Sequence, residues 1–294
     1  MIKMKPVSHN LEETFGDFLD SKRANGLQEK TLQTYQAHFN VVAKHLDMEQ
    51  SIEELSKREI EKALNSIQAS SNSMRSYTAT LKSFLSWCQA EGLSEVSIKL
   101  YKAEETIKDT YTDDELKKLL KKPDTRHCQF AEYRNWVIIN LLLNSGSRAS
   151  TVRNILIKDV DLEGQTISYR HTKNKSIQIV PLCNEMRKIL KEYLRVRDGL
   201  GNDFLFPNQY GGQMTENGLN EAIRRYNRSR GISKTSIHLF RHTFAERYLK
   251  NGGNPFDLQK ILGHSTLAMT KHYCRIYDKE LVRNYDKFSP LQNF

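Results

Sequence analysis

The sequence predicts a mainly α-helical protein with a small antiparallel β-sheet in the second of two domains. Apolar residues recur at steps of three and four over residues 10–100 and over most of the chain after residue 112, which is the helical period. The pattern changes to alternation between Ile155 and Pro181, as in β-strands. A polar segment, residues 99–110, separates the helical parts. We therefore expect a helical domain in residues 1–100, a linker in 101–110 and a second domain in 111–294.

Four amphipathic helices are expected in the first domain. Asn10 with Glu13, and Ser56 with Glu59, have the spacing of capping boxes, which start the first and third helices. The second helix covers residues 31–46, and the fourth follows the third after a short polar run. Short helices with one apolar stripe each pack into a compact bundle.

The start of the fourth helix is rich in polar side chains. Residues 70–76 (SSNSMRS) and those just after them offer hydroxyls, an amide and cations, which hydrogen-bond phosphates and base edges. The candidates for such contacts are Ser73, Arg75, Thr80 and Lys82. A solvated helix face after a serine-rich loop explains the same composition, so both interpretations stay open here.

The second domain begins with a further capping box, Thr112 with Glu115. An apolar run, Trp136 to Leu143, reads as a buried core helix, which Gly146 closes. Arg148 follows directly and opens a new amphipathic segment. Its side chain is therefore expected to emerge at the end of a buried helix, on a rigid support.

The alternating region is expected to form the small antiparallel sheet. Lys173 falls at the turn between its last two strands, where a side chain can reach over a neighbouring site. A turn lysine is more often simply solvated, so its position alone decides nothing.

Two more helices are expected, over residues 184–197 and 215–230. The second ends with Arg224, Arg225 and Arg228, and with amide and aromatic neighbours. Arginines on such a helix suit the major groove of DNA and its phosphate walls.

The composition favours a polyanionic partner and gives no sign of a metal or a membrane. The net charge is +10, from 45 Lys and Arg against 35 Asp and Glu. The four cysteines are scattered without a CxxC pair, which argues against a zinc site and a disulfide framework. No apolar run reaches membrane-spanning length, and the start of the chain lacks the features of a secretory signal. We expect a cytoplasmic protein.

The stretch from residue 237 to 277 carries the most chemically equipped side chains. His238, Arg241 and His242 fall at i, i+3 and i+4, on one face of a helix, and two imidazoles beside a guanidinium suit an anion. His264 follows in a Leu-Gly-His motif, and Tyr273 stands nine residues later.

This order of motifs resembles the tyrosine recombinase (phage integrase) family, in its simple two-domain form because the first helix starts near residue 10. The resemblance implies a helical core DNA-binding domain and a tyrosine-recombinase catalytic domain with a C-terminal tail helix. It also implies double-stranded DNA with inverted-repeat core sites as the partner, a tetramer on that DNA, and accessory DNA-bending factors. The expected setting is an integrase or transposase in the cytoplasm, associated with the nucleoid.

The resemblance also implies the roles of six residues. Carried over by motif, they are Arg148, Lys173, His238, Arg241, His264 and Tyr273. Tyr273 would attack a phosphodiester and form a 3′-phosphotyrosyl link, with no metal, cofactor or ATP. The guanidiniums would hold the non-bridging oxygens, and His238 is expected beside Tyr273 as its base. His264 would donate to a phosphate oxygen, and Lys173 would protonate the departing 5′ oxygen.

One position departs from the family pattern. Thr151 stands where the family usually has an acidic residue, which normally supports the second histidine, here His242. That places His242 and Thr151 behind the reacting groups and leaves the orientation of His242 open. Two alternatives remain at this point: a type IB topoisomerase-like enzyme that relaxes DNA, and a DNA-binding regulator with impaired chemistry.

Overall fold

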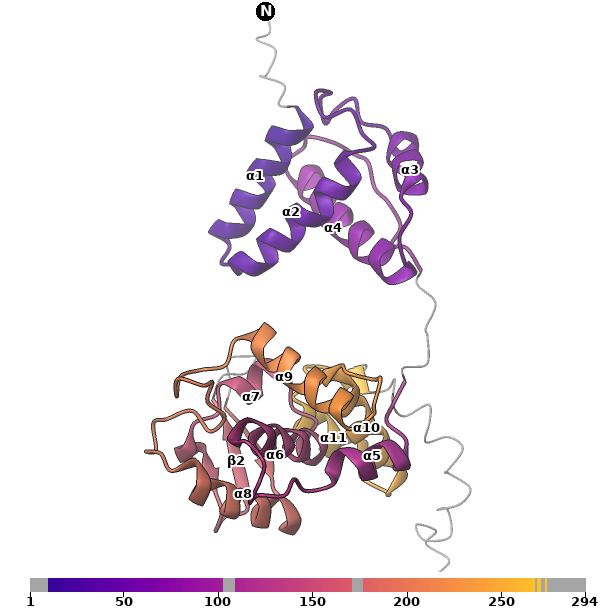
Figure 1. The fold of residues 1–294 in the computed structure, drawn as a ribbon. Helices are drawn as coiled ribbons and strands as arrows, with labels where there is room; N and C mark the ends of the chain where they lie inside the picture. The colour runs from indigo at the N-terminus through magenta and orange to yellow at the C-terminus, as the bar shows by residue number, and fades with distance from the viewer. Residues whose placement is uncertain (1–9, 103–108, 171–176, 268, 271–272, 274–294) are drawn as a thin grey trace, which may run out of the picture. The chain divides into compact units, whose positions relative to one another are not determined.

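The structure is a computed structural model, and it describes residues 10–102, 109–170, 177–267, 269–270 and 273. The chain divides into two compact units, Met1–Ile107 and Lys108–Phe294. Figure 1 shows both units. No helix in the described ranges is long and apolar enough to cross a membrane.

The first unit is a bundle of helices around an aromatic core. Its helices are α1 (Leu11–Ala24), α2 (Glu29–Ala43), α3 (Lys57–Ser66) and α4 (Ser71–Ala90). The ring of Phe15 stacks on Phe39 at 3.7 Å between centroids and meets Phe84 edge-on at 5.2 Å. The capping boxes expected at the starts of α1 and α3 are both present, which confirms that prediction.

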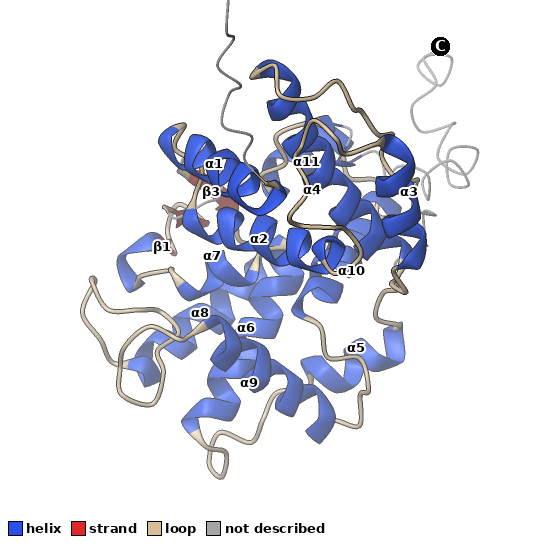
Figure 2. Cartoon of the chain, turned by 90° about the horizontal axis from the view of Figure 1, so that it is seen from above, coloured by secondary structure: helices blue, strands red, loops and turns tan. Residues whose placement is uncertain are grey.

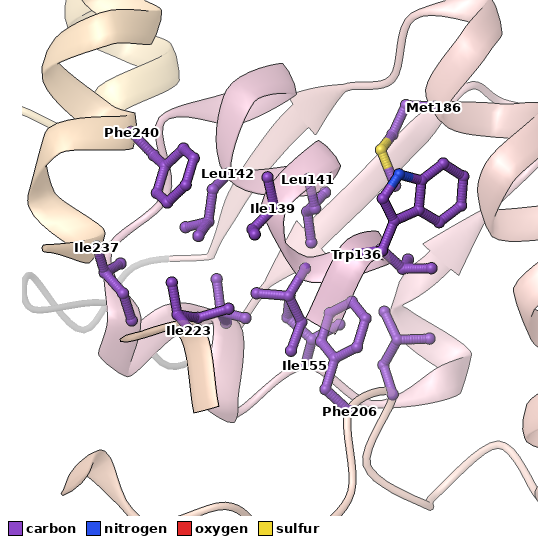
Figure 3. Close-up of a cluster of buried hydrophobic side chains, with 14 of the residues drawn as sticks. Trp136, Ile139, Leu141, Leu142, Ile155, Met186, Phe206, Ile223, Ile237 and Phe240 are labelled. Atoms are coloured by element: carbon purple, nitrogen blue, oxygen red, sulfur yellow. The ribbon is translucent and has the colours of Figure 1, made fainter. Parts of the chain in front are cut away.

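The second unit is built around α6 (Phe130–Ser145), which is buried on nearly every side. The elements around it are α5 (Asp113–Leu120), α7 (Ala149–Arg153), the 3₁₀ turn η1 (Ile157–Asp159), α8 (Asn184–Arg197), α9 (Glu216–Ser229), α10 (Ile237–Lys250) and α11 (Pro255–Leu262). Figure 3 shows Trp136, Ile139 and Leu142 of α6 among side chains of these elements, such as Ile223 of α9 and Phe240 of α10. Helices on several sides of this apolar helix form the main core of the unit, and a smaller apolar cluster lies between α10 and α11.

The sheet is small and antiparallel, in the order β1-β2-β3. Its strands are β1 (Val160–Asp161), β2 (Thr166–Tyr169) and β3 (Gln178–Pro181), and Tyr169 pairs with Gln178. Figure 2 shows helix over most of the described chain and strand in this small sheet. The expected fold class, mainly α with a small antiparallel sheet in the second part, is confirmed. Lys173 lies between β2 and β3, outside the described residues.

The end of α6 brings α10 and α11 together. Gly146 caps α6 with φ of +59°, a left-handed conformation that glycine adopts without strain. A Cβ atom at this position would lie 2.5 Å from the Phe244 ring of α10 and 2.6 Å from the Leu262 side chain of α11. The absence of a side chain at residue 146 therefore lets both helices approach the point where the chain turns towards Arg148.

Candidate active site

Two guanidiniums meet where α6 and α11 end. Arg241, on α10, donates from Nη1 to the Gly146 carbonyl oxygen at 2.8 Å and from Nη2 to the Leu262 carbonyl oxygen at 2.9 Å. Arg148, the N-cap residue of α7, donates from Nη1 to the same Leu262 carbonyl oxygen at 3.4 Å. Carbonyls at helix C-termini carry partial negative charge and lack partners within the helix. They therefore orient both side chains without neutralising them.

The two guanidiniums concentrate positive charge at this point of the site. Within the described ranges, no carboxylate forms an ion pair with Arg148 or Arg241. Burial, and then the charge of Arg148, lower the pKa of Arg241 to about 10. Burial also lowers the pKa of Arg148. Two like charges held together in a partly buried place favour binding of an anion, which relieves their repulsion.

A chain of buried hydroxyls supports the backbone just before Arg148. The Oγ atom of Ser147 lies 2.7 Å from the Tyr169 hydroxyl of β2 and 2.5 Å from Oγ of Ser145. All three residues are buried, so their hydrogen bonds fix the turn after α6 on the sheet. This hydroxyl chain was not predicted; the support expected for Arg148 was the buried helix, α6, that ends just before it.

Tyr273 is the third component of the site. Its hydroxyl lies 2.6 Å from Nδ1 of His242, and its ring packs with Phe244 and Leu249 of α10 and Leu258 of α11. Burial raises the pKa of the Tyr273 phenol, and the charges of Arg241 and Arg148 act against that shift. The phenol is therefore protonated near neutral pH, with an imidazole in contact to accept its proton.

The imidazole beside Tyr273 belongs to His242 and not to His238, the residue expected there from the motif. Both lie on the same face of α10, one turn apart, but His238 is exposed and His242 is partly buried. His242 is thus in direct contact with the expected nucleophile instead of behind the reacting groups. The hydrogen bond with Tyr273 orients the His242 ring through Nδ1. Thr151, at the position where the family usually has an acidic residue, is buried in α7.

His264 adds a neutral imidazole to the two guanidiniums. Its Nδ1 atom lies 2.8 Å from the Thr270 hydroxyl. Burial, and then the charges of Arg241 and Arg148, lower the pKa of His264 to about 4. Near pH 7 it is neutral, and when Nδ1 accepts from Thr270 its Nε2–H is left as a donor.

The arginines near the end of α9 divide into exposed and structural ones. On α9, Arg224 and Arg225 are exposed and pair with Glu221, at 3.3 Å and 3.7 Å, and Arg228 is exposed as well. Arg230 instead pairs with Glu132 at 3.0 Å, which ties α9 to α6.

The α4 candidates divide in the same way. Arg75 and Lys82 are exposed, and Ser73 contacts Ser70 at the start of the helix. Thr80 is buried and its hydroxyl lies 2.9 Å from Nδ1 of His38. The expectation that Thr80 faces a partner is wrong, because this hydroxyl joins α4 to α2.

A family model described as "Phage integrase family" matches residues 110–280, more than half of the chain. The chain belongs to the phage integrase family. It is a tyrosine-type recombinase by this membership, and its relatives carry the same name.

Sequence similarity between this phage integrase family member and its relatives extends over both units. Tyrosine recombinase XerD of Staphylococcus haemolyticus is 28% identical over 280 residues, which cover 90% of this chain and 94% of that protein. Tyrosine recombinase XerC of Thermodesulfovibrio yellowstonii is 29% identical over 226 residues, 72% of this chain and 74% of that protein. XerC of Bacillus subtilis is 31% identical and covers 70% of each chain.

Solved structures share the fold at lower sequence identity. The integrase of transposon Tn1549, in complex with transposon right end DNA, has a TM-score of 0.76 with 19% identity, covering 90% of this chain and 94% of that one. Lambda integrase, as a dimer bound to a core site, has a TM-score of 0.72 with 17% identity, covering 89% and 97%.

Two groups of the site were not predicted from the sequence. The Leu262 carbonyl is a backbone group, so no residue type marks it. Thr270 stands three residues before Tyr273, on the same helical face, and this spacing could have suggested a contact with the site.

Proposed function

We propose that this recombinase cleaves and rejoins duplex DNA at specific sites through a covalent 3′-phosphotyrosyl intermediate on Tyr273. The observation that carries the proposal is the contact of 2.6 Å between the Tyr273 hydroxyl and His242 Nδ1. It lies in the field of two guanidiniums, since the charges of both Arg148 and Arg241 act on Tyr273.

In the proposed cleavage step, side chains of the protein accept and donate every proton that moves. The Tyr273 oxygen attacks the phosphorus atom while its proton passes to Nδ1 of His242. The bond from phosphorus to the 5′ oxygen of the next nucleotide breaks, and that oxygen takes a proton. Lys173 is proposed as the donor from its motif position, which lies outside the described residues.

The two arginines stabilise the five-coordinate transition state. Negative charge develops on the non-bridging oxygens, where forked guanidinium donors form charge-assisted hydrogen bonds. Each guanidinium is already oriented by a helix-terminal carbonyl before DNA arrives, so little reorganisation is needed. We propose that Nε2 of His264 donates to one of the same oxygens.

The phosphotyrosyl bond stores the energy of the broken phosphodiester. A 5′ hydroxyl from another strand then attacks the phosphorus atom and gives its proton to the neutral Lys173 that the cleavage step left. The bond from phosphorus to the Tyr273 oxygen breaks, and His242 returns its proton to that oxygen. Rejoining therefore needs neither metal nor ATP in this scheme.

The proposed substrate is duplex DNA with inverted-repeat core sites. The related lambda integrase structures hold a dimer on a core site and a tetramer on a Holliday junction. By comparison, we propose that the chain acts as an oligomer of four on DNA. The exposed arginines Arg224, Arg225 and Arg228 are proposed contacts, together with Arg75 and Lys82 of the first unit.

Trapping of the covalent intermediate tests this function. Binding sites are first selected from random duplex DNA with Tyr273→Phe protein, which keeps the fold and lacks the nucleophilic hydroxyl. The selected sites are then nicked just beyond each candidate phosphate, so that the short 5′-hydroxyl fragment diffuses away after cleavage. Wild-type protein should accumulate a covalent complex on these duplexes, and Tyr273→Phe should bind them without forming one.

Other outcomes point to other functions. Binding without any adduct on the nicked sites indicates a DNA-binding regulator. Rapid relaxation of supercoiled plasmids that lack the selected sites, without strand exchange, indicates a topoisomerase.

A further inference from the structure

Gln178 of β3 faces inward, towards the end of α11. Its Nε2 atom donates to the Lys260 carbonyl oxygen at 2.7 Å and to the Ile261 carbonyl oxygen at 2.6 Å. Its neighbours Ile177 and Ile179 are 62% and 65% exposed. A half-covered strand normally turns apolar side chains inward and polar ones outward. Val180 follows this rule and is fully buried, but Gln178, two residues before it on the same face, is a polar residue turned inward. Its amide is therefore expected to have a specific role.

The carbonyls at the end of α11 are divided among three kinds of donor. Backbone N–H groups of His264 and Gly263 donate to the carbonyls of Gln259 and Lys260, at 3.1 Å and 3.0 Å. Gln178 donates to those of Lys260 and Ile261. The next carbonyl, that of Leu262, receives both guanidiniums of the site. The Gln178 amide therefore lies directly beside the carbonyl that orients the arginines.

The fit of this amide against α11 is close. Gly263 caps α11 with φ of +62°, and a Cβ atom there would lie 2.8 Å from Oε1 of Gln178. The side chain thus packs against the turn that leads to His264, and it joins β3 to α11 at the site.

An unoccupied carbonyl beside the site would compete for the arginines. Carbonyls of a last helical turn that lack donors are strong acceptors, and an arginine carries five N–H groups able to reach alternative acceptors. Without the Gln178 amide, the Lys260 carbonyl would still accept from the Gly263 N–H, but among the described residues the Ile261 carbonyl would lose its donor. Arg148 and Arg241 would then have a second acceptor next to the Leu262 carbonyl. A guanidinium shared among several carbonyls would spend less time in the orientation that holds a phosphate.

We propose that Gln178 is a positioning residue for the cleavage reaction. By occupying the Ile261 carbonyl, beside the Lys260 carbonyl that the Gly263 N–H already holds, it leaves the Leu262 carbonyl to Arg148 and Arg241 and so fixes both guanidiniums on the phosphate. This inference rests on the proposed function, because the guanidiniums must act on a scissile phosphate.

The test compares Gln178→Met, which keeps the length but cannot donate, with wild type and with Ile179→Met on the outward face of the same strand. The rate of covalent-complex formation is measured at saturating DNA on two nicked substrates. One carries the normal scissile phosphodiester, and the other carries a methylphosphonate, in which a methyl group replaces one non-bridging oxygen and removes its charge. Cleavage of the uncharged group depends less on the arginines, whereas a general loss of folded structure would slow cleavage of both substrates equally.

Gln178→Met should slow cleavage of the phosphodiester by about 10- to 100-fold, the range that misplacement of a binding group produces. Its defect should shrink to less than about threefold on the methylphosphonate, and Ile179→Met should match wild type within about twofold on both. A second variant, Gln178→Glu, has nearly the native shape and cannot donate when ionised, so it should show the same pattern if Gln178→Met folds poorly.

Several results would overturn the inference. One is a rate of covalent-complex formation in Gln178→Met that equals the wild-type rate. Another is an equal loss of rate on the phosphodiester and on the methylphosphonate, which would indicate a general structural role for Gln178. A substrate with sulfur in place of the bridging 5′ oxygen gives a further check, since its leaving group needs no protonation. Rescue on that substrate but not on the methylphosphonate would assign Gln178 to leaving-group protonation. Failure of wild type to form an adduct with the phosphodiester would instead reject the proposed function itself.

Discussion

The Leu262 carbonyl oxygen accepts hydrogen bonds from both Arg148, at 3.4 Å, and Arg241, at 2.9 Å. These arginines lie 93 positions apart in the sequence, from 148 to 241, and meet at one backbone atom. A carbonyl holds a guanidinium in place but leaves its charge available, whereas a carboxylate would neutralise it. The site is thus oriented before an anion binds.

His242 should matter more than His238 for the chemical step. His242→Ala removes the imidazole that contacts the Tyr273 hydroxyl, so the rate of adduct formation should fall by about 10²- to 10⁴-fold with DNA affinity retained. His238→Ala serves as the matched control on the same helix face and should cost less. Single-turnover rates on nicked duplexes measure both. A large loss in His238→Ala with a near-normal His242→Ala would restore the assignment made from sequence.

Arg148→Met should make the free protein more stable while it abolishes cleavage. Arg148 is partly buried, donates one long hydrogen bond, and lies beside Arg241, whose pKa its charge lowers. Removing one of two like charges should raise the free energy of unfolding by about 1 kcal/mol. Arg134→Met is the control. Arg134 is also buried and donates to the Pro207 carbonyl, but its pKa is lowered by burial and not by another positive charge.

Chemical denaturation distinguishes these two variants. Arg134→Met should lower the free energy of unfolding, since it leaves buried acceptors unpaired. If Arg148→Met is destabilised as much as Arg134→Met, repulsion between the site arginines is not significant.

His264 should titrate near pH 4 in the free protein and at a higher pH when DNA is bound. Burial and the two arginine charges lower its pKa from 6.5 to about 4, and a bound phosphate would offset the arginine charges. NMR titration of the imidazole, with and without a selected duplex, measures the shift. An unchanged pKa on DNA would place the phosphate elsewhere.

The same shift makes stability depend on pH. Because the unfolded chain takes up the proton near pH 6.5 and the folded site only near pH 4, stability present above pH 6.5 is lost as the pH falls between these values. The loss should be about 3 kcal/mol at most, and His264→Gln should remove this part of the pH dependence.

Gly146→Ala should be far more damaging than Gly252→Ala. Both residues have positive φ, +59° and +85°, so both substitutions carry the backbone strain of about 1 to 2 kcal/mol. At residue 146 the new Cβ would also lie within 2.6 Å of side chains from α10 and α11, while at residue 252 nothing lies within 4 Å. Gly146→Ala should therefore cost several kcal/mol more and slow cleavage. Equal melting temperatures for the two variants would show that this junction is loosely packed.

Local features of the fold could be predicted from the sequence. The capping boxes at Asn10 and Thr112 and the glycine cap of α6 depend on neighbours within a few positions, so residue types reveal them. The motifs also singled out Arg148, Arg241, His264 and Tyr273, whose side chains the structure brings into one site.

The remainder depends on tertiary contacts that leave no mark in the sequence. His238 and His242 share one helical face, and only the packing of Tyr273 on α10 decides which of them it meets. Thr80 looked like a surface hydroxyl because its partner, His38, comes from another helix. The inward orientation of Gln178 follows from the register of β3 on β2 and from its contact with α11, and the alternation of residue types does not set either of them.

Peptide mapping of the trapped DNA adduct tests the central claim most directly. Trypsin should release residues 272–275 between Lys271 and Arg275, and the nucleotide remnant should lie on this peptide, at Tyr273. The chain contains 13 tyrosines, so the position of the remnant distinguishes the proposed nucleophile from all others. A remnant on any other residue, or no covalent DNA on duplexes that the protein binds tightly, would contradict the account.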